Sequence, residues 1–414
     1  MQVDLGGHRA VSGQHSYRGL LHPVMGHGRR LSRVPLAGSP GAGLAGVPRA
    51  CHSLARLDSR SPPREEIVMG GLGPYFELTK PRVVVLLQIT ALCAVLVHDM
   101  LESGSLSMAS AETMLIVFVG GYLSAGGANA VNMWYDRDID PKMSRTADRP
   151  VPTGAVSPNA ALGFGIALSM LGVAWFVLLA NQVAAFWSAF SILFYVFVYS
   201  IWLKRTTPQN IVIGGIAGST PPVIGWAAAE GDLSLATNSL DSLIDSVLDL
   251  GSLMPWFMFL LIFLWTPPHF WALALYRSGE YEEAGIPMMP NVKGGERTMR
   301  EMKVYTLLLI ALSVAAPMSY GGLDEGDVIY HVLGWTAVGL SIWYASTVWR
   351  IDLDEQPDPS GRIPSAARSF FVSILYLAMM FVVLVTASFG LGGALVGAVL
   401  VLAAIVRSET RAKA

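Results

Sequence analysis

The sequence predicts an all-α membrane protein, a bundle of nine or ten transmembrane helices. Of its 414 residues, 53% are hydrophobic and 14% are charged, whereas soluble proteins carry about a quarter charged residues. The 42 glycines and 24 prolines are typical of membrane helices, which pack through small residues and tolerate kinks. These observations exclude an ordinary soluble enzyme. Because no basic stripe is visible beyond residue 68, we expect no nucleic acid as a partner.

Residues 1–68 differ from the rest of the chain. They contain nine arginines, no lysine and five of the eight histidines, without an apolar run long enough for a signal peptide. Two interpretations remain open: a mitochondrial transit peptide, or a disordered extension upstream of a true start at Met69. The lack of an amphipathic helical period favours the second. We expect the functional domain at 69–390, followed by an extra apolar segment and a basic tail at 391–414.

Nine apolar runs follow the leader, each near the roughly 20 residues that a membrane-spanning helix needs. They cover residues 83–100, 113–132, 159–180, 183–203, 210–229, 255–276, 303–320, 328–349 and 368–388. A further run, 391–406, is shorter and is weakened by glycines, so it is either a tenth span or a re-entrant tail.

The charges of the loops predict the orientation of the bundle. All 19 lysines and arginines beyond the leader lie in alternate loops, and the intervening loops contain acids but no Lys or Arg. The positive-inside rule therefore places the amino terminus and the basic loops in the cytoplasm, or in the matrix of a mitochondrion. We expect the inner (cytoplasmic) membrane, with the mitochondrial inner membrane as the alternative. The basic tail favours a tenth crossing.

The most informative residues follow the second span. Asn132, Asp136 and Asp140 are spaced i, i+4, i+8, so a continuing helix would place their oxygens on one face. Carboxylates at a membrane exit are costly unless they are paired or bind a cation. Oxygen ligands suit Mg²⁺, which often binds one or two carboxylates and substrate phosphates. Basic residues that can hold phosphate oxygens follow at Lys142, Arg145, Arg149, Lys204 and Arg205. We expect a magnesium–diphosphate site here, rather than a solvated helix end closed by salt bridges.

The sixth span carries His269 in its inner half, directly after Pro267 and Pro268. The kinked helix could satisfy this histidine with freed carbonyl groups. Alternatively it contacts a substrate, as a ligand of haem iron or through a propionate, and we favour a role in the site. The fifth span is rich in glycine between 214 and 225. That pattern predicts either close helix packing or room for a flat or long substrate.

Several of these strings resemble a known family. Asn132, Asp136 and Asp140, with Met143-Ser-Arg-Thr146 and Arg149-Pro150 after them, are similar to the first Asp-rich motif of the UbiA-type intramembrane prenyltransferases. The resemblance covers about 75–388. Its other strings are Leu78-Thr-Lys-Pro-Arg82, Leu203-Lys-Arg-Thr-Thr-Pro-Gln-Asn210 and Trp265-Thr-Pro-Pro-His-Phe-Trp271. The last of these is similar to the branch that farnesylates protohaem IX.

The family's second Asp-rich motif is missing after the sixth span. Arg277, Glu280 and Tyr281 stand there instead, a replacement that the resemblance to the haem branch leads us to expect. It argues against the nearer alternative, a UbiA-type enzyme with an aromatic or quinone acceptor.

A cation-coupled transporter is the distant alternative, since transporters place ionisable residues near the midplane. The arginines beside an inner-edge motif favour phosphate instead.

The resemblance implies transfer of a farnesyl group from farnesyl diphosphate to a vinyl group of haem B, which gives haem O. It implies Mg²⁺ as the cofactor, with haem B a substrate, and Asn132, Asp136 and Asp140 as metal ligands. These three residues and His269 form the expected catalytic set. Glu280 and Tyr281 form the second half-site. The expected diphosphate-binding residues are Lys142, Arg145, Arg149, Lys204, Arg205 and Arg277. Further expected partners are the lipid bilayer and a haem A synthase or assembly factor of the terminal oxidase.

Overall fold

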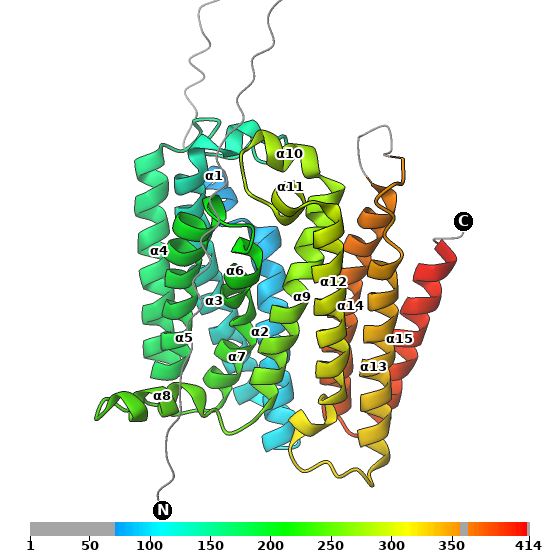
Figure 1. Ribbon diagram of the computed structural model, residues 1–414. Coiled ribbons are helices and arrows are strands. Elements are labelled where there is room, and N and C mark those ends of the chain that lie inside the picture. Colours follow the sequence, from blue (N-terminus) through cyan, green and yellow to red (C-terminus); the bar gives the residue numbers. More distant parts are fainter. Residues whose placement is uncertain (1–70, 357–362, 412–414) are drawn as a thin grey trace, which may run out of the picture. The chain divides into compact units, whose positions relative to one another are not determined.

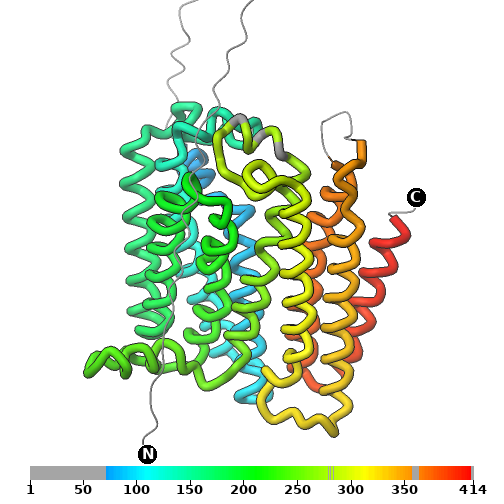
Figure 2. The backbone as a smooth tube through the Cα atoms, in the orientation of Figure 1, coloured from blue at the N-terminus to red at the C-terminus, as the bar shows by residue number. Residues whose placement is uncertain are grey.

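The computed structural model describes residues 71–356 and 363–411 (Figure 1), so the predicted leader, 1–68, lies outside the described residues. Within those ranges every regular element is a helix. The path of the chain is clearest in Figure 2. The α-helices are α1 (Leu72–Leu78), α2 (Pro81–Glu102), α3 (Met108–Tyr135), α4 (Pro158–Leu179), α5 (Gln182–Leu193), α6 (Asn210–Ser219), α7 (Pro221–Ala229), α8 (Leu240–Leu248), α9 (Met254–Tyr276), α10 (Ser278–Glu283), α11 (Met289–Lys293), α12 (Gly295–Val314), α13 (Val328–Trp349), α14 (Pro364–Ser388) and α15 (Leu391–Arg411). A π-helix, Phe194–Trp202, continues α5.

The chain is an integral membrane protein, as its composition predicts. Nine helical segments of the described ranges are long and apolar enough to cross a bilayer. They are Pro81–Glu102, Met108–Asp138, Pro158–Leu179, Gln182–Arg205, Asn210–Ala229, Met254–Tyr276, Val328–Trp349, Pro364–Ser388 and Leu391–Arg411. The last of them has 21 residues, a length that favours a span over a re-entrant tail. It packs against α13 and α14.

The predicted span 303–320 is wrong in its boundaries. The helix found there, α12, begins eight residues earlier at Gly295 and ends at Val314. Its first turns carry Glu296, Arg297 and Arg300, so it is not among the nine apolar segments. It still lies against α9 and α13 and belongs to the bundle.

Prolines and small polar side chains determine where many helices begin. Pro81, Pro158 and Pro364 occupy the first turns of α2, α4 and α14, where the missing N–H costs no hydrogen bond. Ser107 caps α3 by accepting a hydrogen bond from the Ser110 backbone N–H at 3.4 Å. The predicted fifth span is divided into α6 and α7, because Pro221 cannot continue the backbone ladder of α6.

Glycines allow the helices around the division to pack closely. A Cβ atom on Gly225 would lie 2.2 Å from the Ala91 carbonyl oxygen of α2, and one on Gly214 would lie 2.3 Å from the Tyr199 ring. At these positions the glycine-rich span serves helix packing. A Cβ atom on Gly218 meets nothing within 4 Å, so packing does not account for every glycine.

One end of the bundle gathers the residues that the sequence singles out. The start of α2, the end of α3 and the short helices α10 and α11 lie at the end drawn uppermost in Figure 1. Helix α8 lies at the opposite end and runs across the bundle. The charges of the loops predict that the first of these ends is the inner one.

Candidate active site

The Asn132–Asp140 segment is buried, but it is not one continuous helix. Helix α3 ends at Tyr135, and two 3₁₀ turns follow, Asp136–Asp138 and Asp140–Lys142. The expectation of a helical face running to Asp140 is therefore wrong beyond the end of α3. Even so, Asn132, Asp136 and Asp140 are 3%, 0% and 2% exposed. Charged groups this deeply buried need partners.

The amide of Asn132 has a partner on each side. Its Nδ2 donates to Asp136 Oδ2 at 3.0 Å and to Ser200 Oγ at 2.9 Å. Its Oδ1 accepts a hydrogen bond from Lys80 Nζ at 2.7 Å. Neither Lys80 nor Ser200 was among the predicted site residues. Lys80 lies in the string Leu78-Thr-Lys-Pro-Arg82, which marked the family but not a role, and nothing in the sequence singles out Ser200.

Asp136 is paired with the end of the fourth span. Lys204 Nζ donates to Asp136 Oδ2, and Arg205 Nη2 lies 3.6 Å from Asp136 Oδ1. That second oxygen is buried and has no hydrogen-bond donor. Arg205 itself binds both oxygens of Asp138, at 2.7 and 2.8 Å. The structure thus brings Lys204 and Arg205, which the sequence predicts as diphosphate-binding residues, to Asp136.

Asp140 is held by Arg149. One guanidinium nitrogen, Nη1, lies 2.9 and 2.8 Å from its two carboxylate oxygens. The Thr146 hydroxyl donates to the Asp140 backbone carbonyl at 2.7 Å and fixes the turn between them. Lys142 and Arg145 are exposed on the same loop, and among the described contacts neither pairs with a carboxylate of this site.

Ser200 lies in the π-helix, and the two basic residues of the site, Lys204 and Arg205, follow just after it. Such a segment contains one more residue per hydrogen-bonded ring than an α-helix and is common at functional sites. Ser200 Oγ donates to the Tyr195 carbonyl at 2.9 Å, so its lone pairs are turned toward Asn132. The Tyr195 hydroxyl in turn donates to Asn129 Oδ1 at 3.4 Å.

The predicted second half-site packs onto the loop that carries the acids. Tyr281 is buried in one hydrophobic cluster with Ile139 and Met143, residues that flank Asp140. Asn210 Nδ2 donates to the Pro287 carbonyl at 3.4 Å and holds the following segment. The Arg277 guanidinium carbon lies 5.5 Å from the centre of the Tyr276 ring. The Glu280 side chain lies outside what the structure describes.

His269 lies between two aromatic rings rather than against a freed carbonyl group. Its ring stacks on Trp265 and Phe370, with centroid distances of 4.2 and 4.7 Å. Its Nδ1 is 2.6 Å from Ser373 Oγ of α14. Among the described contacts, no hydrogen bond or ion pair connects His269 to Asn132, Asp136 or Asp140. The structure therefore places the histidine among Trp265, Phe370 and Ser373, without a direct contact to the three acidic-motif residues.

The acidic cluster carries an excess of positive charge. Lys80, Arg149, Lys204 and Arg205 surround three carboxylates, those of Asp136, Asp138 and Asp140. Burial lowers the pKa of the Lys80 ammonium well below its usual range, and the neighbouring charges of Arg149 and Lys204 act in the same direction. A polyanion placed here would oppose both effects, so the electrostatics suit a diphosphate.

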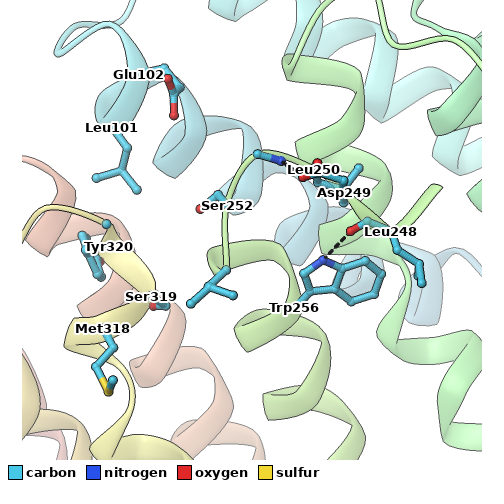
Figure 3. A pocket seen from close by; sticks show the side chains of 13 residues that line it. Leu101, Glu102, Leu248, Asp249, Leu250, Ser252, Trp256, Met318, Ser319 and Tyr320 are labelled. Carbon is cyan, nitrogen blue, oxygen red and sulfur yellow. Dashed lines mark hydrogen bonds between the residues drawn. The ribbon is translucent and has the colours of Figure 1, made fainter. Parts of the chain in front are cut away.

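A separate pocket lies at the opposite end of α2 and is shown in Figure 3. It has a volume of about 670 Å³ and is lined by Glu102, Asp249, Trp256 and Tyr320, among others. Because it adjoins Leu101 and Glu102 at the end of α2, whereas Lys80 precedes its start, it is not part of the acidic cluster.

Comparison with known proteins decides the family. Residues 89–360 match the UbiA prenyltransferase family. The chain belongs to this family. The match spans α2 to the loop after α13 and includes every buried acid of the cluster.

Curated relatives of the UbiA chain place it in one branch. It is 43% identical to a protoheme IX farnesyltransferase of Parvibaculum lavamentivorans over 328 residues, which are 78% of this chain and 92% of the relative. It is 44% identical to a protoheme IX farnesyltransferase of Beijerinckia indica over 319 residues, 77% of this chain and 89% of the relative. The resemblance carried by the string at 265–271 is thereby confirmed, and the chain is a prenyltransferase of this branch.

Solved structures of UbiA-type proteins confirm the fold. A structure titled as digeranylgeranylglyceryl phosphate synthase in membranes aligns with a TM-score of 0.57 at 17% identity, covering 77% of this chain and 99% of that one. An apo UbiA homolog from Aeropyrum pernix K1 aligns with a TM-score of 0.52 at 21% identity, over 72% and 97%. A homolog from Archaeoglobus fulgidus, bound to GPP and Mg²⁺, aligns with a TM-score of 0.50 at 15% identity, over 77% and 100%.

The donor set of this UbiA chain fits a magnesium ion. Asn132, Asp136 and Asp140 offer only oxygen ligands at low exposure, and Asp136 Oδ1 is a buried oxygen without a donor. Among the described residues no group of three or more His, Cys, Asp or Glu side chains could hold a metal alone. One amide and two carboxylates suit Mg²⁺, which binds through one or two carboxylates and completes its shell with substrate phosphates and water.

Proposed function

We propose that the chain transfers the farnesyl group of farnesyl diphosphate to a vinyl group of haem B and so makes haem O. The observation that carries this proposal is the buried cluster of Asn132, Asp136 and Asp140, surrounded by four basic side chains at the inner end of the bundle. The protoheme IX farnesyltransferases that are over 40% identical to it across the aligned residues support the choice of haem as acceptor.

We infer that Mg²⁺ is the cofactor and that Asn132, Asp136 and Asp140 hold it. The Archaeoglobus fulgidus homolog bound to GPP and Mg²⁺ supports this choice. When bound, the ion would neutralise the charge that grows on the diphosphate as the carbon–oxygen bond breaks. The oxygen-only donor set fits that role, as does Asp136 Oδ1, which accepts no hydrogen bond and lies 3.6 Å from Arg205 Nη2.

Two basic residues, Arg149 and Lys204, would change their partners when a cation and a diphosphate are bound. Arg149 and Lys204 neutralise Asp140 and Asp136 in the structure described here. With a cation held by the carboxylates, both side chains would be free to turn to phosphate oxygens, which arginine binds bidentately. Arg205 remains anchored by Asp138, so it offers a fixed positive charge. Lys142, Arg145 and Arg277 are proposed as outer contacts of the diphosphate.

The bundle supplies no nucleophile, because the vinyl carbon of the porphyrin attacks the allylic carbon of the donor. The bond from that carbon to the diphosphate oxygen breaks, and diphosphate leaves. Water adds to the cation left on the acceptor and a proton is released, which gives the hydroxyethylfarnesyl group. The allylic cation must be shielded from bulk water until then. Tyr281, buried in one hydrophobic cluster with Ile139 and Met143, would help to exclude water there.

His269 is proposed as the haem contact. Ser373 Oγ is within hydrogen-bond distance of the Phe370 carbonyl, at 2.5 Å; when it donates there, His269 donates to Ser373 from Nδ1. A neutral imidazole in this arrangement carries its lone pair on Nε2, the form that ligates iron. The flat rings of Trp265 and Phe370 on either side would orient it for a planar porphyrin.

The proposed location is the inner (cytoplasmic) membrane, with the acidic cluster toward the cytoplasm. Both substrates carry long or flat apolar parts and would enter from the lipid. A haem A synthase or a terminal oxidase assembly factor would be the partner that receives haem O.

Reconstituted full-length protein tests the function. Vesicles containing the protein, haem B, farnesyl diphosphate and Mg²⁺ should yield haem O, detected by its mass, and EDTA should stop the reaction. A parallel incubation replaces haem B by an aromatic quinone precursor. Product from that acceptor and none from haem B would contradict the proposal.

A further inference from the structure

Lys80 has a strained backbone. Its φ and ψ are 52° and 60°, and it is the one non-glycine residue with positive φ in the part of the chain that the structure describes. It also precedes Pro81, and a residue before proline favours extended conformations. Strain of this kind persists when the surrounding structure enforces it, and it concentrates at functional sites.

The neighbouring residue is tied to α3, which enforces the strain. The Thr79 carbonyl accepts a hydrogen bond from Asn129 Nδ2 at 3.1 Å, and the Thr79 hydroxyl is 2.8 Å from the Tyr122 hydroxyl. Asn129 lies just under one helical turn before Asn132. The chain is therefore fixed against α3 immediately before Lys80, and α2 begins immediately after it.

The consequence is a lysine that reaches Asn132 from the junction of α1 and α2. Lys80 Nζ contacts Asn132 Oδ1 at 2.7 Å. A metal ion on that same oxygen would stand beside the ammonium and repel it. Because Lys80 has a flexible four-carbon stem, its charge can move a short way to the anionic phosphates that accompany the metal.

We propose that Lys80 is a diphosphate-binding residue, held on Asn132 Oδ1 until Mg²⁺ takes that oxygen. The proposal rests on the function proposed above, since it needs a magnesium–diphosphate site. It adds a fourth chain segment, the α1–α2 junction, to the segments that contact the leaving group. Glycine at this position would remove the backbone strain. The proposal explains why lysine is present instead, because its side chain is needed to bind the diphosphate.

The test measures binding of inorganic diphosphate to purified full-length protein by calorimetry, with and without saturating Mg²⁺. Lys80→Met removes the charge, and Lys80→Gly removes the charge and the backbone strain together. Both variants should bind diphosphate about tenfold or more weakly with Mg²⁺ present, the effect of one lost charge-assisted hydrogen bond. Lys80→Arg should restore most of the binding. Arg82→Met removes an exposed positive charge two residues away and should change little.

Thermal unfolding of the same variants separates binding from structure. Lys80→Gly should melt above Lys80→Met, because glycine adopts positive φ without strain. Lys80→Met binding diphosphate as tightly as wild type would overturn the proposal, as would a Lys80→Gly variant that fails to fold. If wild type itself shows no Mg²⁺-dependent binding, the proposed magnesium–diphosphate site falls, and this inference falls with it.

Discussion

A single guanidinium nitrogen of Arg149, Nη1, donates to both carboxylate oxygens of Asp140, at 2.9 and 2.8 Å. The two residues are nine positions apart, and the Thr146 hydroxyl fixes the turn that joins them. The same arginine is among the charges that lower the pKa of Lys80. Acid, arginine and lysine therefore form one electrostatic unit, and a change in one of them alters the environment of the others.

Replacing either acid by its amide should remove catalysis while the protein remains folded. We expect Asp136→Asn and Asp140→Asn each to lower the turnover rate by about 10²–10³, the usual effect of losing one preorganised electrostatic contact. Haem O formation in membranes measures this, with immunoblotting to confirm insertion. Asp148→Asn, an exposed acid on the same loop, is the matched control. Normal turnover of both variants at saturating Mg²⁺ would show that the metal assignment is wrong.

Residues 1–68 should be dispensable for the reaction. A variant that begins at Met69 keeps every residue placed in the site, since the described chain starts at residue 71. We expect its activity in isolated membranes to equal that of the full-length protein. Import into mitochondria is a separate assay. Inactivity of a correctly inserted short variant would refute this prediction.

His269→Ala should affect the binding of haem and the binding of farnesyl diphosphate differently. If the ring addresses haem, affinity for farnesyl diphosphate stays near normal, and affinity for haem or the rate with haem falls. Separate titrations of each substrate measure this, and the Soret band of bound haem should shift if Nε2 ligates iron. Ser373→Ala removes the partner of Nδ1 and should give a weaker version of the same change.

If His269→Ala instead weakens the Mg²⁺-dependent binding of farnesyl diphosphate, the histidine takes the place of the missing second acidic motif. Unchanged binding and turnover would leave it a purely structural role.

Two glycines of the divided fifth span should respond differently to alanine. In Gly225→Ala the new Cβ would lie 2.2 Å from the Ala91 carbonyl oxygen, so α2 and α7 must separate at a cost of about 1–3 kcal/mol. Gly218→Ala meets nothing within 4 Å and should be neutral or slightly stabilising. Thermal inactivation in detergent measures both. If Gly218→Ala keeps its stability but loses activity, the space beside that glycine belongs to a substrate.

The positions of most helices were predictable because the bilayer sets their length. Apolar runs predicted Pro158–Leu179 and Val328–Trp349 within a residue. The same reasoning misplaced α12, because its first turns carry charged residues that the apolar run does not include. Hydropathy also gave no warning of the break at Pro221 or of the π-helix, since neither changes the apolar character of the chain.

The acids and basic residues of the cluster were predictable from type and spacing, but their partners were not. Lys80 meets Asn132 from 52 residues earlier in the chain, and Ser200 from 68 residues later. Such contacts depend on how whole helices pack. The predicted helical spacing to Asp140 also failed, because the chain leaves α3 at Tyr135, although the Asp140 carboxylate is buried.

The π-helix Phe194–Trp202 makes the length of this segment as important as its side chains. Deleting one residue between Phe194 and Tyr199 would allow an ordinary α-helix to form. The residues after the deletion would then take new angular positions about the helix axis, because an α-helix and a π-helix turn by different angles per residue. Lys204 would turn away from Asp136, and Ser200 from Asn132, with no side chain of the cluster altered. Insertions and deletions here should therefore be as damaging as substitutions of the acids themselves, whereas the lipid-facing surface of the same helix should accept many apolar replacements.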